Sequence, residues 1–224
     1  MTRARIRAGL VALLVLAGAS QLAAGAWIHL KAGVAQVLLR SAWARTKRDA
    51  WARTQRDASE RTERDDRAHT QHDAESRVVQ YGTPQRPWPW ADTAPIARLI
   101  APRLGVDLIV LEGFSGQALA FGPGLVRGHD GTVVLSAHRD THFAFLRDVM
   151  PGERLVLERA GEAAREFRVR ETRVVDYRDA GALLAGRPDA LVLVTCWPLD
   201  AIAPGGPLRL VVVAEHGAFM NSPG

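Results

Sequence analysis

The pattern of apolar and polar residues divides this chain of 224 residues into three main stretches. Residues 9–30 are mostly apolar, residues 40–77 mix basic with acidic side chains, and the chain from Ile96 onward carries short apolar runs separated by turn residues. Short apolar runs with turn residues at both ends are typical of β-strands. The last stretch contains eight predicted strands, at residues 96–100, 108–111, 118–121, 132–136, 154–157, 167–175, 191–195 and 208–214.

Many short strands with turn signals between them predict a closed or sandwiched antiparallel sheet, so the fold class is mostly β. We expect Gly122-Pro123-Gly124 and the stretch from Gly128 to Gly131 to break the chain between strands. Residues 179–185 are expected to form one short helical turn. With 47% hydrophobic and 24% charged residues, the composition is that of an ordinary folded protein.

The first thirty residues have the layout of a membrane-targeting segment. Three arginines precede residues 9–30, which carry no formally charged side chain apart from a possible charge on His29. About 20 mostly apolar residues are enough to cross a bilayer as a helix. A cleaved signal peptide is the alternative, but the apolar stretch is longer than the roughly 7–15 residues of a typical signal core. We therefore expect residues 1–30 to be an uncleaved signal anchor that leaves the rest of the chain outside the cytoplasm.

A repeat with a period of eight residues follows. Residues 42–49 (AWARTKRD) are repeated at residues 50–57 (AWARTQRD), and weaker copies occupy residues 58–65 and 66–73. A period of eight matches neither a solenoid unit nor the spacing of a coiled-coil seam. We interpret residues 31–80 as a charged spacer, helical or partly disordered. The net charge is +5, but basic and acidic residues are mixed along the chain, so we expect no nucleic-acid partner.

Cys196 is the only cysteine of the chain and comes at the end of the predicted strand 191–195. Pro198 cannot donate to a sheet ladder, so the strand is expected to end near the thiol, which would then lie at the mouth of the sheet. Composition alone favours a plainer interpretation, because an unpaired cysteine is most often a small buried apolar side chain.

Two further residues could complete a chemical site around this thiol. His138 follows the strand 132–136, and Arg209 stands in the otherwise apolar strand 208–214. An imidazolium or guanidinium favours the thiolate form of a cysteine, and an arginine can hold a carbonyl oxygen that becomes an oxyanion. Together these groups are the parts of an acyl transfer through a thioester.

In these motifs the chain resembles the sortases, a family of membrane-anchored cysteine transpeptidases. The resemblance spans residues 84–214. Within the family, the chain is similar to the proteobacterial, Gram-negative type. It rests on Ser136-Ala137-His138-Arg139-Asp140-Thr141-His142-Phe143, on Leu191-Val192-Leu193-Val194-Thr195-Cys196, and on Leu208-Arg209-Leu210-Val211-Val212-Val213-Ala214, with Trp88-Pro89-Trp90-Ala91-Asp92 as a further detail.

The resemblance implies an eight-stranded β-barrel with short helices, with His138, Cys196 and Arg209 at one end. It also implies that Cys196 attacks a backbone carbonyl in a sorting motif near the C-terminus of a secreted partner protein, and that an amine acceptor resolves the thioester. Thr195 would help to position the substrate or the oxyanion. The domain order expected from it is a signal anchor at 1–30, a spacer at 31–80, a catalytic domain at 81–219 and a tail at 220–224.

We expect no metal and no cofactor. On an extended segment His138 and His142 would lie too far apart to share one ion, so His142, Asp140 and His129 are interpreted as loop residues. The expected location is the inner membrane, with a single span and the catalytic domain on the periplasmic side. Two other functions fit the same residues: a thiol endopeptidase that uses water as acceptor, and a non-catalytic, membrane-tethered β-domain that binds a peptide.

Overall fold

The structure, a computed structural model, describes residues 34–59, 84–128, 130–179, 181, 187–201 and 205–216. The predicted signal anchor and the tail lie outside these residues, as does most of the helical turn expected at 179–185. Within the described segments, no helix is both long and apolar enough to cross a membrane. The chain divides into two compact units, Met1–Leu38 and Leu39–Gly224, and all the strands of the described residues belong to the second.

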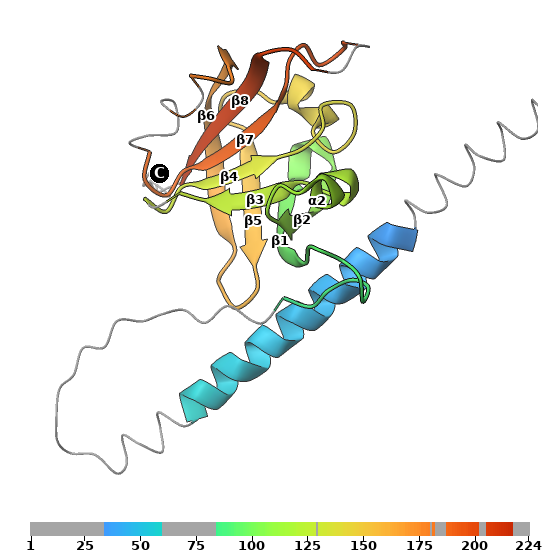
Figure 1. Ribbon diagram of the computed structural model, residues 1–224. Coiled ribbons are helices and arrows are strands. Elements are labelled where there is room, and N and C mark those ends of the chain that lie inside the picture. Colours follow the sequence, from blue (N-terminus) through green and yellow to red (C-terminus); the bar gives the residue numbers. More distant parts are fainter. Residues whose placement is uncertain are drawn as a thin grey trace, which may run out of the picture. The chain divides into compact units, whose positions relative to one another are not determined.

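Eight strands close into one β-barrel, which confirms the mostly β class (Figure 1). Around the barrel the strand order is β1-β2-β3-β4-β7-β8-β6-β5. The elements are β1 (Pro95–Ala101), η1 (Pro102–Leu104), β2 (Val106–Glu112), α2 (Gly116–Phe121), β3 (Gly124–Arg127), β4 (Val133–Ser136), η2 (Ala144–Asp148), β5 (Arg154–Arg159), β6 (Arg165–Asp176), β7 (Leu191–Cys196) and β8 (Leu208–His216).

The expectation of a purely antiparallel sheet was wrong for two neighbouring pairs. β2 with β3 and β4 with β7 run parallel, whereas the other six pairs are antiparallel. Parallel neighbours need a crossover connection instead of a hairpin. α2 provides the crossover from β2 to β3, and β5 and β6 lie between β4 and β7 in the chain.

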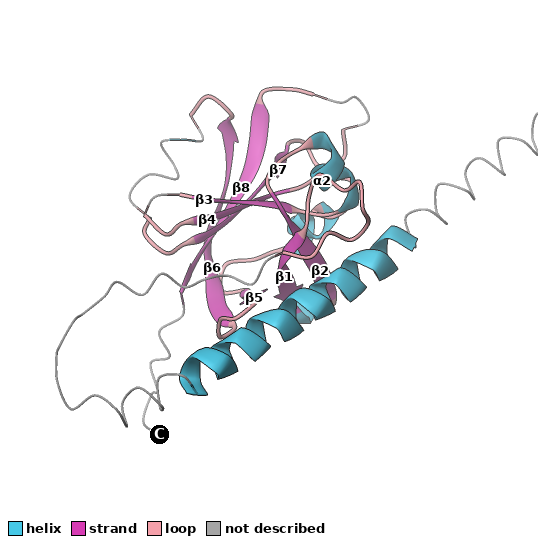
Figure 2. Ribbon diagram, turned by 60° about the horizontal axis from the view of Figure 1, so that its bottom comes forward, coloured by secondary structure: helices cyan, strands magenta, loops and turns pink. Residues whose placement is uncertain are grey.

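The strand predicted at residues 118–121 was also wrong, because these residues belong to helix α2 (Figure 2). The Ser115 side chain accepts a hydrogen bond from the Ala118 backbone N–H, which is the usual way a serine begins a helix. β3, which the sequence did not predict, follows directly. Its first residue must be glycine, since a Cβ on Gly124 would come within 2.1 Å of the Gly113 carbonyl oxygen.

The interior of the barrel is filled by alternate residues of every strand. This alternation follows from the two-residue period of a strand, in which successive side chains point to opposite faces. Phe143, Leu146 and Val149, from and around η2, close one part of the core. The inward residues of the strands are Ala97, Leu99, Ala101, Val110, Leu125, Val133, Leu135, Leu155, Leu157, Phe167, Val169, Leu191, Leu193, Leu210, Val212 and Ala214.

Residues 34–59 form a helix that carries the first two octads, and we call it the repeat helix (Figure 2). Its residues Leu39, Trp43 and Ala50 recur at helical spacing and pack in one apolar cluster. The barrel residues of that cluster are Ile109, Leu111, Ala118 and Ala160. This part of the predicted spacer therefore buries an apolar face on the barrel.

The repeat helix is also tied to the barrel by polar contacts. The Lys47 ammonium lies 3.3 Å from a Glu158 carboxylate oxygen, and the Thr46 hydroxyl accepts a 3.1 Å hydrogen bond from the Gln85 backbone N–H. The ion pair is solvent-exposed and adds little stability, whereas the apolar burial contributes more.

The two tryptophans of the octads test this arrangement, because they occupy equivalent repeat positions but differ in burial. Trp43 is 5% exposed and Trp51 is 66% exposed. We expect Trp43→Ala to lower the free energy of unfolding by about 3 kcal/mol and Trp51→Ala to change it by less than about 0.5 kcal/mol, measured by urea denaturation of the whole chain. Equal effects of the two substitutions would contradict the packing of the repeat helix on the barrel.

Candidate active site

The registers of three neighbouring strands bring the predicted site residues to the same level of the barrel. Cys196 on β7 is paired directly with Arg209 on β8. β4 runs parallel to β7, and its last paired residues are Ser136 and Val194. The Ala137 backbone N–H still donates to the Val194 carbonyl at 3.4 Å, so His138 follows β4 at the level of Cys196.

The side-chain alternation puts the three residues on one face. Ala137 and Leu210 belong to the barrel core, so His138 and Arg209, each one position away, fall on the outer side. Cys196 lies two residues after Val194, which packs with the apolar cluster on the outer face of β7 and β8. His138 is exposed, and Cys196 and Arg209 are partly buried, so solvent reaches all three.

Thr195 faces the other way and is only 2% exposed. Its hydroxyl donates a 2.7 Å hydrogen bond to the Ala137 carbonyl oxygen. This bond joins the residue before Cys196 to the residue before His138. Any influence of Thr195 on a substrate therefore acts through the backbone of β7 and the end of β4.

Arg209 is held at one end of its guanidinium group. Its Nη1 donates to the carbonyl oxygens of Gly206 and Leu208, both at 2.8 Å. Its guanidinium carbon lies 5.6 Å from the centre of the Tyr177 ring. Among the described residues, Nε and Nη2 make no hydrogen bond, which leaves their N–H groups available to an anionic or carbonyl oxygen.

The turn after His138 is built from its own backbone and one buried arginine. The Phe143 N–H donates to the His138 carbonyl oxygen at 3.0 Å, and Arg139, 8% exposed, donates from Nη2 to the Ala201 carbonyl oxygen at 2.9 Å. Ala201 follows β7, so Arg139 connects the segments that carry His138 and Cys196. Sequence reasoning missed this role; the signal was a charged residue next to the site histidine.

His142 lies in the same turn. Burial lowers its pKa, the nearby His138 lowers it further, and Asp140 opposes both effects. His142 is therefore neutral at neutral pH. The hydrogen bond from the Phe143 N–H to the His138 carbonyl oxygen folds the chain into a turn here, so His142 lies closer to His138 than it would on an extended segment.

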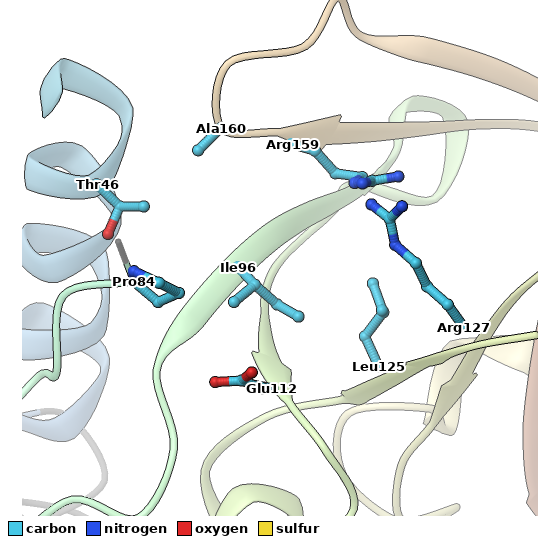
Figure 3. Close-up of a pocket in the computed structure, with 8 residues that line it drawn as sticks. All are labelled: Thr46, Pro84, Ile96, Glu112, Leu125, Arg127, Arg159 and Ala160. Atoms are coloured by element: carbon cyan, nitrogen blue, oxygen red, sulfur yellow. The ribbon is translucent and has the colours of Figure 1, made fainter. Parts of the chain in front are cut away.

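A separate pocket of about 360 Å³ lies between the repeat helix and the barrel and contains none of these residues (Figure 3). Arg127 and Arg159 lie side by side in it, as Figure 3 shows, and both are near Glu162 Oε1, at 3.7 and 2.6 Å. None of the residues that line the pocket is paired with Cys196 or Arg209, and we assign the pocket no part in the chemistry.

The family model of the Sortase domain matches residues 99–217, so the chain belongs to the sortase family, whose members are cysteine transpeptidases. Sortase D of Bacillus subtilis (strain 168) is 29% identical over 122 residues, which cover 51% of this chain. The chain spans 60% of the length of that relative.

A solved structure supports the same fold. Sortase A from Corynebacterium diphtheriae, a lid mutant, superposes with a TM-score of 0.50 and 26% sequence identity. The match covers 57% of this chain and 73% of that chain. The expected sortase-type barrel is thereby confirmed.

The link made by Arg139 can be tested against an exposed arginine of the same region. We expect Arg139→Gln to lower the free energy of unfolding by about 1.5–3 kcal/mol, because a buried hydrogen bond from a charged group is lost. Arg147, which donates to the Ala144 carbonyl at 3.0 Å from an exposed position, is the matched control, and Arg147→Gln should change stability by less than about 0.5 kcal/mol. Thermal or urea denaturation measures both effects. An Arg139→Gln variant with unchanged stability would contradict a stabilising connection between the segments that carry His138 and Cys196.

Proposed function

We propose that this chain is a membrane-anchored cysteine transpeptidase that cleaves a C-terminal sorting motif of a secreted partner protein and transfers the new acyl end to an amine acceptor. The observation that carries the proposal is the direct pairing of Cys196 with Arg209, with His138 at the same level. A nucleophile, a proton carrier and an oxyanion donor are the groups that this reaction requires.

In the first half of the reaction, the Cys196 thiolate attacks the carbonyl carbon of the scissile peptide bond. The carbonyl oxygen takes up the negative charge, and the Nε–H and Nη2–H groups of Arg209 stabilise it. His138, as imidazolium, gives its proton to the departing amine. The C–N bond breaks, and a thioester on Cys196 and a neutral imidazole remain.

In the second half, an acceptor amine attacks the thioester carbonyl. His138 takes the proton that the amine loses, Arg209 holds the oxyanion again, and the thiolate leaves as the C–S bond breaks. Thr195 supports both halves by fixing the end of β4 to β7 through its hydrogen bond to Ala137. Water in place of the amine would make the enzyme an endopeptidase.

The proposed location is the inner membrane, with the catalytic domain on the periplasmic side. The support is the apolar, signal-like layout of residues 9–30, which follows three arginines and precedes the spacer. Tethering would keep the enzyme next to partner proteins that are still attached to the membrane by their own C-terminal segments.

Transfer through a thioester can be tested with hydroxylamine as a general acceptor. We expect the purified enzyme, given a randomised peptide pool, to release peptides that end in a hydroxamate, because hydroxylamine resolves a thioester to a hydroxamic acid and the free thiol. Mass spectrometry identifies the product and the preferred motif. Cys196→Ala and His138→Ala are expected to give none. Products that end only in carboxylates, at every acceptor concentration, would favour the endopeptidase, and no cleavage of any peptide would favour a binding domain.

Arg209 is tested by a substitution that keeps its charge. We expect Arg209→Lys to lower kcat about a hundredfold, because the ammonium group lacks the planar donor fork that would face the oxyanion. Arg170 is an exposed control on the neighbouring strand β6, paired with Glu215 at 2.9 Å, and Arg170→Lys should leave kcat unchanged. Full turnover of Arg209→Lys would exclude Arg209 from the mechanism.

A further inference from the structure

Arg209 has an aromatic neighbour that the mechanism above does not use. Tyr177 is the residue directly after β6, and its ring centre lies 5.6 Å from the Arg209 guanidinium carbon. A guanidinium within about 6 Å of a ring centre is attracted by the negative face of the ring. Tyr177 is 53% exposed, so the ring has no large share in the core.

The backbone fixes Tyr177 beside Arg209. In the β6–β8 ladder Val175 pairs with Arg209 and Asp176 with Leu208. The Tyr177 N–H continues this ladder with a 2.8 Å hydrogen bond to the Pro207 carbonyl oxygen. The residues on either side of Pro207, which are Gly206 in the turn and Leu208 at the start of β8, supply their carbonyls to Arg209 Nη1. These three hydrogen bonds thus hold the Tyr177 backbone and the Arg209 guanidinium in fixed positions relative to one another.

An arginine side chain has several rotatable bonds, and it loses considerable entropy when it is fixed. The two carbonyls restrain only Nη1, around which the rest of the guanidinium plane could still turn. A ring against the plane restricts that turning. The orientation of Nε and Nη2 then exists before the substrate arrives, and such preorganised donors are the effective ones in a transition state.

We propose that Tyr177 is a positioning residue for Arg209, acting through the face of its ring and not through its hydroxyl. The inference rests on the proposed role of Arg209 in acyl transfer and adds the group that orients it. Tyr177 itself does not contact the reacting atoms.

Arg178 provides a matched control. Its guanidinium carbon lies 5.5 Å from the centre of the same ring, and its Nε lies 3.8 Å from Asp176 Oδ1. Arg178 therefore shares the ring with Arg209 without belonging to the site. Replacing Arg178 leaves the contact between Tyr177 and Arg209 in place.

The test compares Tyr177→Leu, Tyr177→Phe and Arg178→Gln in the whole enzyme, with the peptide and hydroxylamine of the transfer assay. We expect Tyr177→Leu to lower kcat about fivefold with KM unchanged, since the oxyanion contact forms only in the transition state. Tyr177→Phe should retain kcat within about twofold because the ring face is kept. Arg178→Gln should match the wild type. Thermal denaturation should show the same midpoint for all variants.

A spectroscopic measurement gives a second readout that does not depend on turnover. The ring current of Tyr177 should displace the Arg209 Nε–H resonance, which the Arg209→Lys variant assigns by its loss. Tyr177→Leu should move this resonance toward the position of an unstacked arginine, and Tyr177→Phe should not. A resonance unchanged in Tyr177→Leu would overturn the inference.

The outcomes separate this inference from the proposed function. If Arg209→Lys loses activity while Tyr177→Leu keeps it, the positioning role fails and the mechanism stands. A rise in KM alone in Tyr177→Leu would make Tyr177 a substrate contact, and an equal loss in Tyr177→Phe and Tyr177→Leu would assign the effect to the hydroxyl; either result overturns the inference. Full activity of Arg209→Lys would instead remove the role of Arg209 on which the inference rests.

Discussion

The hydrogen-bond ladder that joins β7 to β4 on one side and to β8 on the other is the constraint on which the site depends. A slip of one residue in either ladder would move a side chain to the opposite face of the sheet. β7 and β8 are apolar on both faces, with Leu193 and Val212 inside and Val192 and Val211 outside. Hydrophobic burial alone therefore fixes the register of these strands weakly, because a slipped strand would still bury apolar groups.

Polar contacts near the site fix the strand register that the apolar pattern leaves weakly determined. The hydrogen bond from Thr195 to Ala137 forms only when β4 and β7 are in the observed register. A buried hydroxyl without an acceptor is costly, so a slip would be penalised at this residue. The threonine before the nucleophile thus belongs to the structure of the site even though its hydroxyl faces the barrel interior.

Much of the fold could be predicted from the sequence. The strands β1, β2 and β4–β8 coincide with segments in which apolar residues recur and which turn residues separate. The segment around α2 and β3 could not be predicted, because Ala118–Phe121 is apolar enough for either structure and its helix depends on the Ser115 cap. The apolar face of the repeat helix could not be predicted from the octad repeat either. Its tryptophans recur every eight residues, which a helix cannot place on one face, and the buried face is instead made by Leu39, Trp43 and Ala50. Only the packing partners on the barrel reveal it.

The three principal site residues could be predicted, because Cys196 and His138 come just after apolar runs, Arg209 interrupts one, and the family resemblance links the three, but their supports could not. One of the two carbonyls that hold Arg209 comes from a turn in which Gly205 and Gly206 have φ angles of +91° and +94°. Residues with a Cβ rarely adopt such angles, so this glycine pair lets the chain turn back and aim the Gly206 carbonyl at Nη1. In the sequence the pair indicates only a turn. Its contribution to the site follows from the strand register, which brings Arg209 opposite Cys196 and leaves the guanidinium within reach of its own preceding turn.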